Sequence, residues 1–177
     1  EIFSFLAKRK GKLEAVELTG GEPTLQPDLL EILKKVKAMG YLTKLDSNGS
    51  NPEIVQKAVD LNLVDYLAMD VKAPLEKYRR IVDYGVDLNK IKQSIALIMN
   101  SGSEYEFRTT VVKSQLNKDD ILKIGQLIKG AKLYILQKFV PGKVLKPHLF
   151  KQETYSDDEF EDFKNSLSDY VVRCIIR

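Results

Sequence analysis

A glycine pair followed by an acidic residue, Gly20-Gly21-Glu22-Pro23, comes directly after an apolar run at residues 15–18. Glycines allow a backbone to approach a ligand closely and to point amide or carbonyl groups at it. Glycine pairs are common in loops between a strand and a helix, so this pair alone is weak evidence for a binding site. The chain contains neither GxxxxGKS/T nor GxGxxG, and a cradle for nucleotide phosphates is therefore disfavoured.

Charged residues follow the apolar runs further along the chain. Asp46 and Asp70 each end such a run, and a carboxylate there is costly unless it is paired or lies at a polar opening. Each aspartate alone fits a helix N-cap or a turn equally well. Together with Lys72 and Arg108 they form a mixed-charge set that suits a zwitterionic small molecule. Ester hydrolysis is disfavoured, because the sequence offers neither a Ser/His/Asp set nor a histidine cluster.

These residues need a framework of strands that alternate with helices. Apolar runs separated by helical patterns and turns predict an α/β fold with five parallel strands, near residues 14–18, 42–46, 64–70, 105–112 and 133–139. Polar residues at the carboxyl ends of such strands form the site, which places Gly21, Asp46, Asp70 and Arg108 along one rim. A helical pattern precedes the first of these strands, so we expect that a still earlier strand is missing.

The rest of the chain completes a single predicted domain over residues 1–177. Ser156 and Glu159 form a capping box that predicts a C-terminal helix over 156–177, with Cys174 as a buried thiol on its apolar stripe. His148, the only histidine, falls in a Pro-containing loop and is predicted to lie at the surface.

Composition excludes several classes of protein. The 177 residues carry a net charge of +3, too balanced for a dedicated nucleic-acid binder. No apolar run approaches the roughly 18–20 residues that span a bilayer, so we expect no membrane partner. A single cysteine excludes an internal disulfide and fits a reducing cytoplasm.

Several segments, in order, resemble the radical S-adenosylmethionine enzymes. The GGEPTLQ stretch at 20–26 resembles the second signature of that family. The segments at 45–49 (LDSNG) and 67–72 (LAMDVK) resemble motifs of its glycyl-radical-enzyme activases, and those at 107–112 (FRTTVV) and 136–142 (LQKFVPG) resemble later strands of the same proteins. The resemblance covers roughly residues 1–146 and is strongest to the branch of the anaerobic ribonucleoside-triphosphate reductase and pyruvate formate-lyase activases.

The resemblance implies an incomplete (β/α)6 TIM-like partial barrel that binds S-adenosylmethionine and a 4Fe–4S cluster. By position, backbone atoms of the glycine turn would line the methionine amino group, and the acidic strand ends would lie beside the methionyl carboxylate, with a monovalent cation as a further prediction. Lys72 and Arg108 would contact the carboxylate or the ribose, and two residues of the last strand would flank the adenosine. The implied cofactor-binding residues are Gly20, Gly21, Glu22, Pro23, Asp46, Ser47, Asn48, Asp70, Lys72, Arg108, Gln137 and Phe139, and the cation would lie at Asp46, Ser47 and Asp70.

One departure from the family is severe, because the CxxxCxxC motif that ligates the cluster is missing. The family carries this motif after its first strand, upstream of everything present here, and Cys174 cannot replace it. The missing strand, the start at Glu1 rather than Met and the missing cysteines lead us to expect that an N-terminal segment is absent or disordered.

The resemblance implies an activase in the intact protein. Its 5′-deoxyadenosyl radical would take a hydrogen from a glycine of a partner such as anaerobic ribonucleotide reductase, with flavodoxin or ferredoxin as electron donor. Two alternatives remain open, namely a cluster-less module for cofactor binding or partner docking, and a radical enzyme acting on a small molecule.

Overall fold

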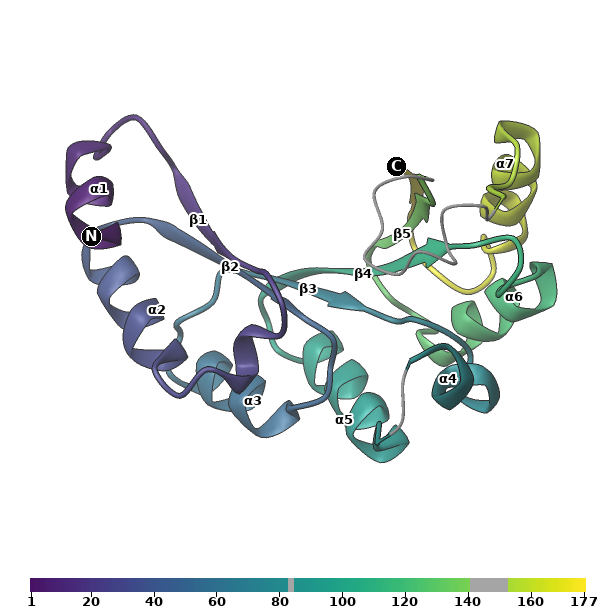
Figure 1. Cartoon of the computed structure of the whole chain (residues 1–177), viewed down its shortest axis with the longest axis horizontal. Coiled ribbons are helices and arrows are strands. Elements are labelled where there is room, and N and C mark those ends of the chain that lie inside the picture. Colours follow the sequence, from purple (N-terminus) through teal and green to yellow (C-terminus); the bar gives the residue numbers. More distant parts are fainter. Residues whose placement is uncertain (83–84, 141–152) are drawn as a thin grey trace. The chain divides into compact units, whose positions relative to one another are not determined.

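The computed structural model describes residues 1–82, 85–140 and 153–177. Helices and strands alternate along most of the chain (Figure 1). The helices are α1 (Ile2–Lys8), η1 (Pro23–Leu25, a 3-10 turn), α2 (Leu29–Ala38), α3 (Pro52–Asp60), α4 (Leu75–Ile81), α5 (Leu88–Met99), α6 (Lys118–Leu127) and α7 (Asp157–Ser166). The strands are β1 (Ala15–Leu18), β2 (Leu42–Ser47), β3 (Tyr66–Asp70), β4 (Glu104–Val111), β5 (Tyr134–Lys138) and β6 (Cys174–Ile176).

The six strands follow one another in chain order in one sheet. β1 pairs with β2 and β2 with β3 in parallel, and β4, β5 and β6 form a second parallel series. The five predicted strands are therefore confirmed, each within two residues of its expected bounds at either end. Parallel strands joined by helices confirm the predicted α/β fold class.

The chain divides into two compact units. Unit 1 comprises Glu1–Met69 and Asn89–Tyr105, and unit 2 comprises Asp70–Leu88 and Glu106–Arg177. Strands β3 and β4 each contribute residues to both units, and in each unit a residue next to β3 is hydrogen-bonded to β4. In unit 1 the amide of Glu104 donates to the carbonyl of Asp65, and in unit 2 the amide of Val71 donates to the carbonyl of Arg108. The single-domain assignment stays a prediction.

Unit 1 has its core between the strands and the helices on one side of them (Figure 1). Leu45 in β2 and Leu67 in β3 are buried, as are Leu33 of α2 and Val55 of α3. Since successive side chains of a strand point to opposite faces, Lys44 and Asp46 lie on the face opposite Leu45. Burial of the apolar face thus directs the charged residues of β2 toward the other side of the sheet.

The predicted C-terminal helix over 156–177 is wrong beyond Ser166. The capping box of Ser156 and Glu159 is present, but α7 ends at Ser166. The residues that follow include a sixth strand, β6, whose Cys174 lies opposite Tyr134 of β5. Short apolar runs fit a helix or a strand equally well, and the run of β-branched residues here favours the strand. Cys174 is therefore a half-buried strand residue and does not lie on a helical stripe.

No helix in the described part of the chain is both long enough and apolar enough to cross a membrane. His148 and the last two residues of the segment 136–142 lie outside the described residues.

Candidate functional site

The glycine turn directly follows β1 in unit 1. Gly20 has a φ of +92° and Gly21 a φ of +58°, both in the left-handed region that favours glycine. Both residues are exposed, and a Cβ built on either would meet no atom within 4 Å. The backbone conformation therefore requires these glycines, while the open space beside them leaves room for a ligand.

The side chain of Glu22 joins the glycine turn to the loop after β2. Its Oε1 accepts hydrogen bonds from the Thr24 amide (3.2 Å), the Thr24 hydroxyl (2.6 Å) and the Ser47 hydroxyl (3.0 Å). Its Oε2 accepts from the backbone amide of Asn48 at 2.6 Å. Glu22 is only 9% exposed, so this carboxylate is committed to bonds within the protein.

Ser47 and Asn48 organise the loop after β2. The Ser47 hydroxyl donates to Glu22 and also accepts from the Gly49 amide at 3.0 Å. The Asn48 side chain accepts from the Ser50 amide at 2.9 Å, as in an Asx turn. Both side chains therefore shape this loop themselves.

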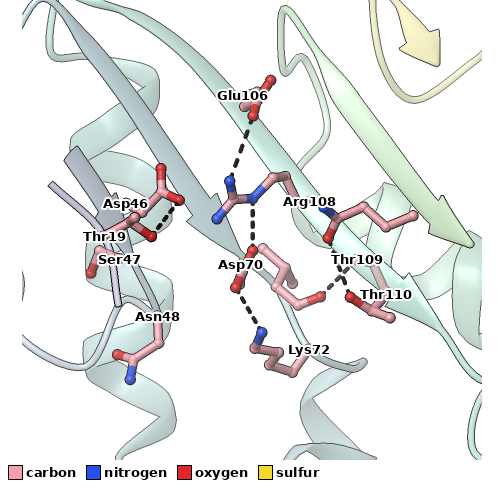
Figure 2. Close-up of polar contacts among 12 residues, drawn as sticks. Thr19, Asp46, Ser47, Asn48, Asp70, Lys72, Glu106, Arg108, Thr109 and Thr110 are labelled. Carbon is pink, nitrogen blue, oxygen red and sulfur yellow. Dashed lines mark hydrogen bonds and ion pairs between the residues drawn. The ribbon is translucent and has the colours of Figure 1, made fainter. Parts of the chain in front are cut away.

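Asp46 lies one residue before the end of β2 and is buried. Its Oδ2 accepts from the Thr19 hydroxyl at 3.1 Å (Figure 2), and its Oδ1 lies 3.5 Å from Lys44 Nζ. Thr19 immediately precedes the glycine pair. Asp46 thus ties the start of the glycine turn to β2, and Glu22 ties its end.

Unit 2 contains a row of alternating charges at the end of β3 and on β4 (Figure 2). Asp70 Oδ2 lies 2.7 Å from Lys72 Nζ, and Asp70 Oδ1 accepts from Arg108 Nε at 2.8 Å. Arg108 Nη1 lies 3.8 Å from the buried Glu106, whose other oxygen lies 3.5 Å from Arg177 Nη2. The row therefore contains three cations and two carboxylates.

The two cations next to Asp70 keep it ionised. Burial opposes ionisation of this carboxyl group, yet the charges of and hydrogen bonds from Lys72 and Arg108 lower its pKa below the usual value. Lys72, with 37% of its side chain exposed, is the more accessible cation, whereas the Arg108 side chain is 12% exposed. Lys72 is thus better placed than Arg108 to contact an added anion.

The predicted adenosine residues lie at the end of β5. Gln137 is half-buried and accepts from the Thr110 hydroxyl at 3.2 Å, and Phe139 is buried at 6% exposure. Earlier in β5, Tyr134 donates to Thr109 and Thr109 to the carbonyl of Val71, at 2.7 and 2.6 Å. Burial raises the pKa of Tyr134 well above its usual value, so this hydrogen-bond chain stays neutral.

The predicted site residues therefore fall into two groups, one in each unit. Unit 1 holds Gly20, Gly21, Glu22, Pro23, Asp46, Ser47 and Asn48, and unit 2 holds Asp70, Lys72, Arg108, Gln137 and Phe139. The predicted monovalent cation requires Asp46 from one unit and Asp70 from the other, and it stays a prediction.

The sequence placed Thr19 and the neighbourhood of Arg108 at the rim but assigned no role to Thr19 or to Glu106. Thr19 precedes the glycine pair, where a hydroxyl is common in any loop, and no sequence signal marks it. Glu106 precedes Arg108 by two residues in a strand, so both side chains lie on one face. That spacing of opposite charges on one strand is a signal that could have identified Glu106.

The donor groups fit S-adenosylmethionine better than they fit an iron–sulfur cluster. Open backbone groups at the glycine turn suit an ammonium, and Lys72 suits a carboxylate. A cluster with one open iron needs three thiolates, and the printed sequence has one cysteine. Among the described residues, no group of three or more His, Cys, Asp or Glu side chains could hold a metal ion.

Comparisons with known proteins identify relatives over most of the chain. A protein of Methanocaldococcus jannaschii provisionally named a glycyl-radical enzyme activating enzyme is 32% identical over 169 residues, which cover 93% of this chain and 70% of that protein. The 7-carboxy-7-deazaguanine synthase of Thermococcus kodakarensis is 27% identical over 143 residues, or 80% of this chain and 54% of the enzyme. The chain thus spans about half the length of the second relative.

Solved structures share the fold. A domain of a pyruvate-formate lyase-activating enzyme from Bacteroides vulgatus has a TM-score of 0.68 at 19% identity, covering 93% of this chain and 99% of that domain. Streptococcus suis SuiB has a TM-score of 0.73 at 13% identity, covering 99% of this chain and 42% of SuiB. The predicted fold of the radical S-adenosylmethionine family is therefore confirmed. The family model of the radical SAM superfamily matches residues 1–128, so this chain belongs to the radical S-adenosylmethionine superfamily.

Proposed function

We propose that this chain binds S-adenosylmethionine and is the cofactor-binding part of a glycyl-radical enzyme activase. The observation that carries the proposal is the 32% identity, over 93% of the chain, to a protein named for that activity. The open left-handed turn at Gly20 and Gly21 supports it, because it offers backbone groups to a ligand without steric obstruction.

The two groups of residues would serve different parts of the cofactor. In unit 1, backbone carbonyls of Gly20 and Gly21 would accept from the methionyl ammonium, with Pro23 fixing the turn and Asp46 adding negative charge. In unit 2, Lys72 would attract the methionyl carboxylate. Arg108 would share the negative charge of Asp70 with Lys72, so that Lys72 keeps positive charge to offer to the ligand. Gln137 and Phe139 remain the proposed neighbours of the adenosine.

In the intact protein, we propose, a 4Fe–4S cluster would supply the electron that makes the bound cofactor reactive. The residues of this chain do not supply its ligands, so their part is to bind and orient the cofactor. The partner would be a glycyl-radical enzyme of the anaerobic ribonucleotide reductase or pyruvate formate-lyase type, the electron donor flavodoxin or ferredoxin, and the compartment the cytoplasm.

Binding of S-adenosylmethionine to the 177-residue chain tests the first part of the proposal. Gly20→Ala puts a side chain on a left-handed residue, which costs about 1–2 kcal/mol and should weaken binding roughly fivefold to thirtyfold. Gly40→Ala is the matched control, because Gly40 has a φ of +85° and equally open space but precedes β2 instead of following β1. Calorimetric titration that finds no binding to the unaltered chain, or equal losses in both variants, would refute the assignment.

The activase assignment is tested with the full-length protein under anaerobic conditions. We expect a glycyl radical, detected by electron paramagnetic resonance, on a partner enzyme after incubation with cofactor and reductant. The similarity to 7-carboxy-7-deazaguanine synthase favours a small-molecule substrate as the second candidate. Cofactor cleavage that depends on a small molecule and leaves every glycyl-radical enzyme tested unmodified would support that candidate. Binding without iron uptake would support the cluster-less module.

A further inference from the structure

The glycine turn is anchored to β2 on both sides of the glycine pair. Before the pair, Thr19 donates to Asp46, and after it Glu22 accepts from Ser47 and Asn48. Two consecutive glycines form the most flexible backbone a chain can have, so an ordered turn of this kind needs restraints from outside itself. The restraint after the pair comes from one carboxylate.

We propose that Glu22 is a positioning residue, whose side-chain carboxylate holds the backbone of Gly20 and Gly21 in the conformation that receives the cofactor. This inference rests on the proposed function for the identity of the ligand. It adds a role for the Glu22 side chain, where the resemblance implies only a role for its backbone. Because the side chain is 9% exposed and its oxygens are bonded within the protein, it acts through the turn and not by touching the ligand.

The four donors around Glu22 explain why a carboxylate is needed. They are the amide and hydroxyl of Thr24, the hydroxyl of Ser47 and the amide of Asn48, at 2.6–3.2 Å. An ionised carboxyl group only accepts hydrogen bonds, so it can satisfy all four donors. A glutamine side chain of the same size carries an NH2 group, which would face a backbone N–H whichever way the amide is turned. Glu22→Gln therefore loses the link on one side of the pair.

Loss of the link lowers the fraction of molecules whose turn can bind. The apparent dissociation constant rises in inverse proportion to that fraction. If the competent turn falls to a tenth of the population, affinity for S-adenosylmethionine falls tenfold. Stability falls as well, so a second carboxylate that accepts several hydrogen bonds within unit 1 is required to separate the two effects.

Asp65 provides the matched control in the same unit. Its carboxylate accepts from Lys37 Nζ, from the Thr43 amide and from the Thr43 hydroxyl, at 2.7–3.1 Å. These bonds join the start of β2 to the residue before β3, away from the glycine turn along the chain. Asp65→Asn should therefore lower the melting temperature, as Glu22→Gln does, without changing affinity for the cofactor.

The experiment compares the unaltered chain, Glu22→Gln and Asp65→Asn by calorimetric titration with S-adenosylmethionine, well below each melting temperature. Backbone amide signals of 15N-labelled glycine are recorded for the same three proteins without ligand. We expect Glu22→Gln to weaken binding about tenfold or more and to shift or broaden the Gly20 and Gly21 signals, and Asp65→Asn to do neither. Unchanged affinity in Glu22→Gln, or an equal loss in Asp65→Asn, would overturn the proposal.

A third variant, Ser47→Ala, covers the case in which Glu22→Gln does not fold. It removes one donor and leaves the carboxylate with the other three, so we expect a smaller loss of affinity together with the same glycine signal changes. Unmoved glycine signals in Ser47→Ala would then overturn the proposal. Absence of binding to the unaltered chain would refute the proposed function, while the glycine signals would still decide whether Glu22 orders the turn.

Discussion

Replacing Asp70 with asparagine should destabilise unit 2 in a way that depends on pH. The substitution keeps the size of the side chain and removes the charge that faces Arg108 at 2.8 Å and Lys72 at 2.7 Å. A hydrogen bond between charged groups contributes about 1.5–3 kcal/mol when it is largely buried, as the one to Arg108 is. The pair with Lys72 is more exposed and contributes about 1 kcal/mol or less.

The expected loss at neutral pH is therefore about 1.5–4 kcal/mol. For a protein of this length, each kcal/mol corresponds to a change of about 2–4 °C in melting temperature, so the variant should melt roughly 3–16 °C lower. The folded-state pKa of Asp70 is lowered, although burial opposes ionisation, because Lys72 and Arg108 stabilise the charged form. A lowered pKa gives stability that is fully present above the unfolded value, about 3.9, and is lost as the pH falls through the folded value.

Urea unfolding followed by far-ultraviolet circular dichroism at pH 7, 5, 4 and 3 tests this reasoning. The difference between the unaltered chain and Asp70→Asn should be constant from pH 7 to 5 and should shrink below about pH 4. Lys72→Met removes only the more exposed partner and should cost about 1 kcal/mol or less. A difference that does not change between pH 7 and 3, or a loss in Lys72→Met as large as in Asp70→Asn, would refute the assignment of stability to the Arg108 bond.

Three further outcomes are expected. Gly49→Ala should destabilise the chain by about 2 kcal/mol or more in thermal melts, because its Cβ would clash with the methyl group of Met69. Gly102 has nearly the same φ and open space around it, so Gly102→Ala should lose clearly less stability. Burial raises the pKa of Cys174 to about 12, so native protein at pH 8 should react with a thiol reagent far more slowly than urea-unfolded protein, and equal rates would contradict this. Anaerobic reconstitution of the 177-residue chain with iron and sulfide should give no stable 4Fe–4S absorption, and a stoichiometric cluster would show that its ligands have been misidentified.

The sequence by itself determined the order and type of most elements of this protein. Five apolar runs separated by helical patterns predicted β1 to β5, because the burial of one face of a parallel strand leaves a strong local signal. The turn itself was also readable from Gly20 and Gly21, but its link to a ligand came from the resemblance of residues 20–26 to a family signature, because glycine pairs are common between a strand and a helix. Asp46, Asp70 and Arg108 could be selected because charges are rare at the ends of such runs or within them.

The last strand could not be predicted in the same way. Tyr170, Val171 and Cys174 fit the spacing of a helix as well as that of a strand, and the preceding capping box pointed to a helix. Pairing with β5, from Tyr134 opposite Cys174 to Leu136 opposite Ile176, decided between them. Local pattern leaves such a choice open because the deciding hydrogen bonds come from residues about forty positions away.

Tertiary structure alone decided the partners of the polar side chains. Glu22 reaches Ser47 across 25 residues of sequence, and Arg108 reaches Asp70 across 38. Residue type shows that a buried carboxylate needs donors, but not which donors the folded chain brings to it. The physical reason is that parallel strands place side chains from distant segments beside one another, so the chemistry of this protein depends on pairings that no local pattern records.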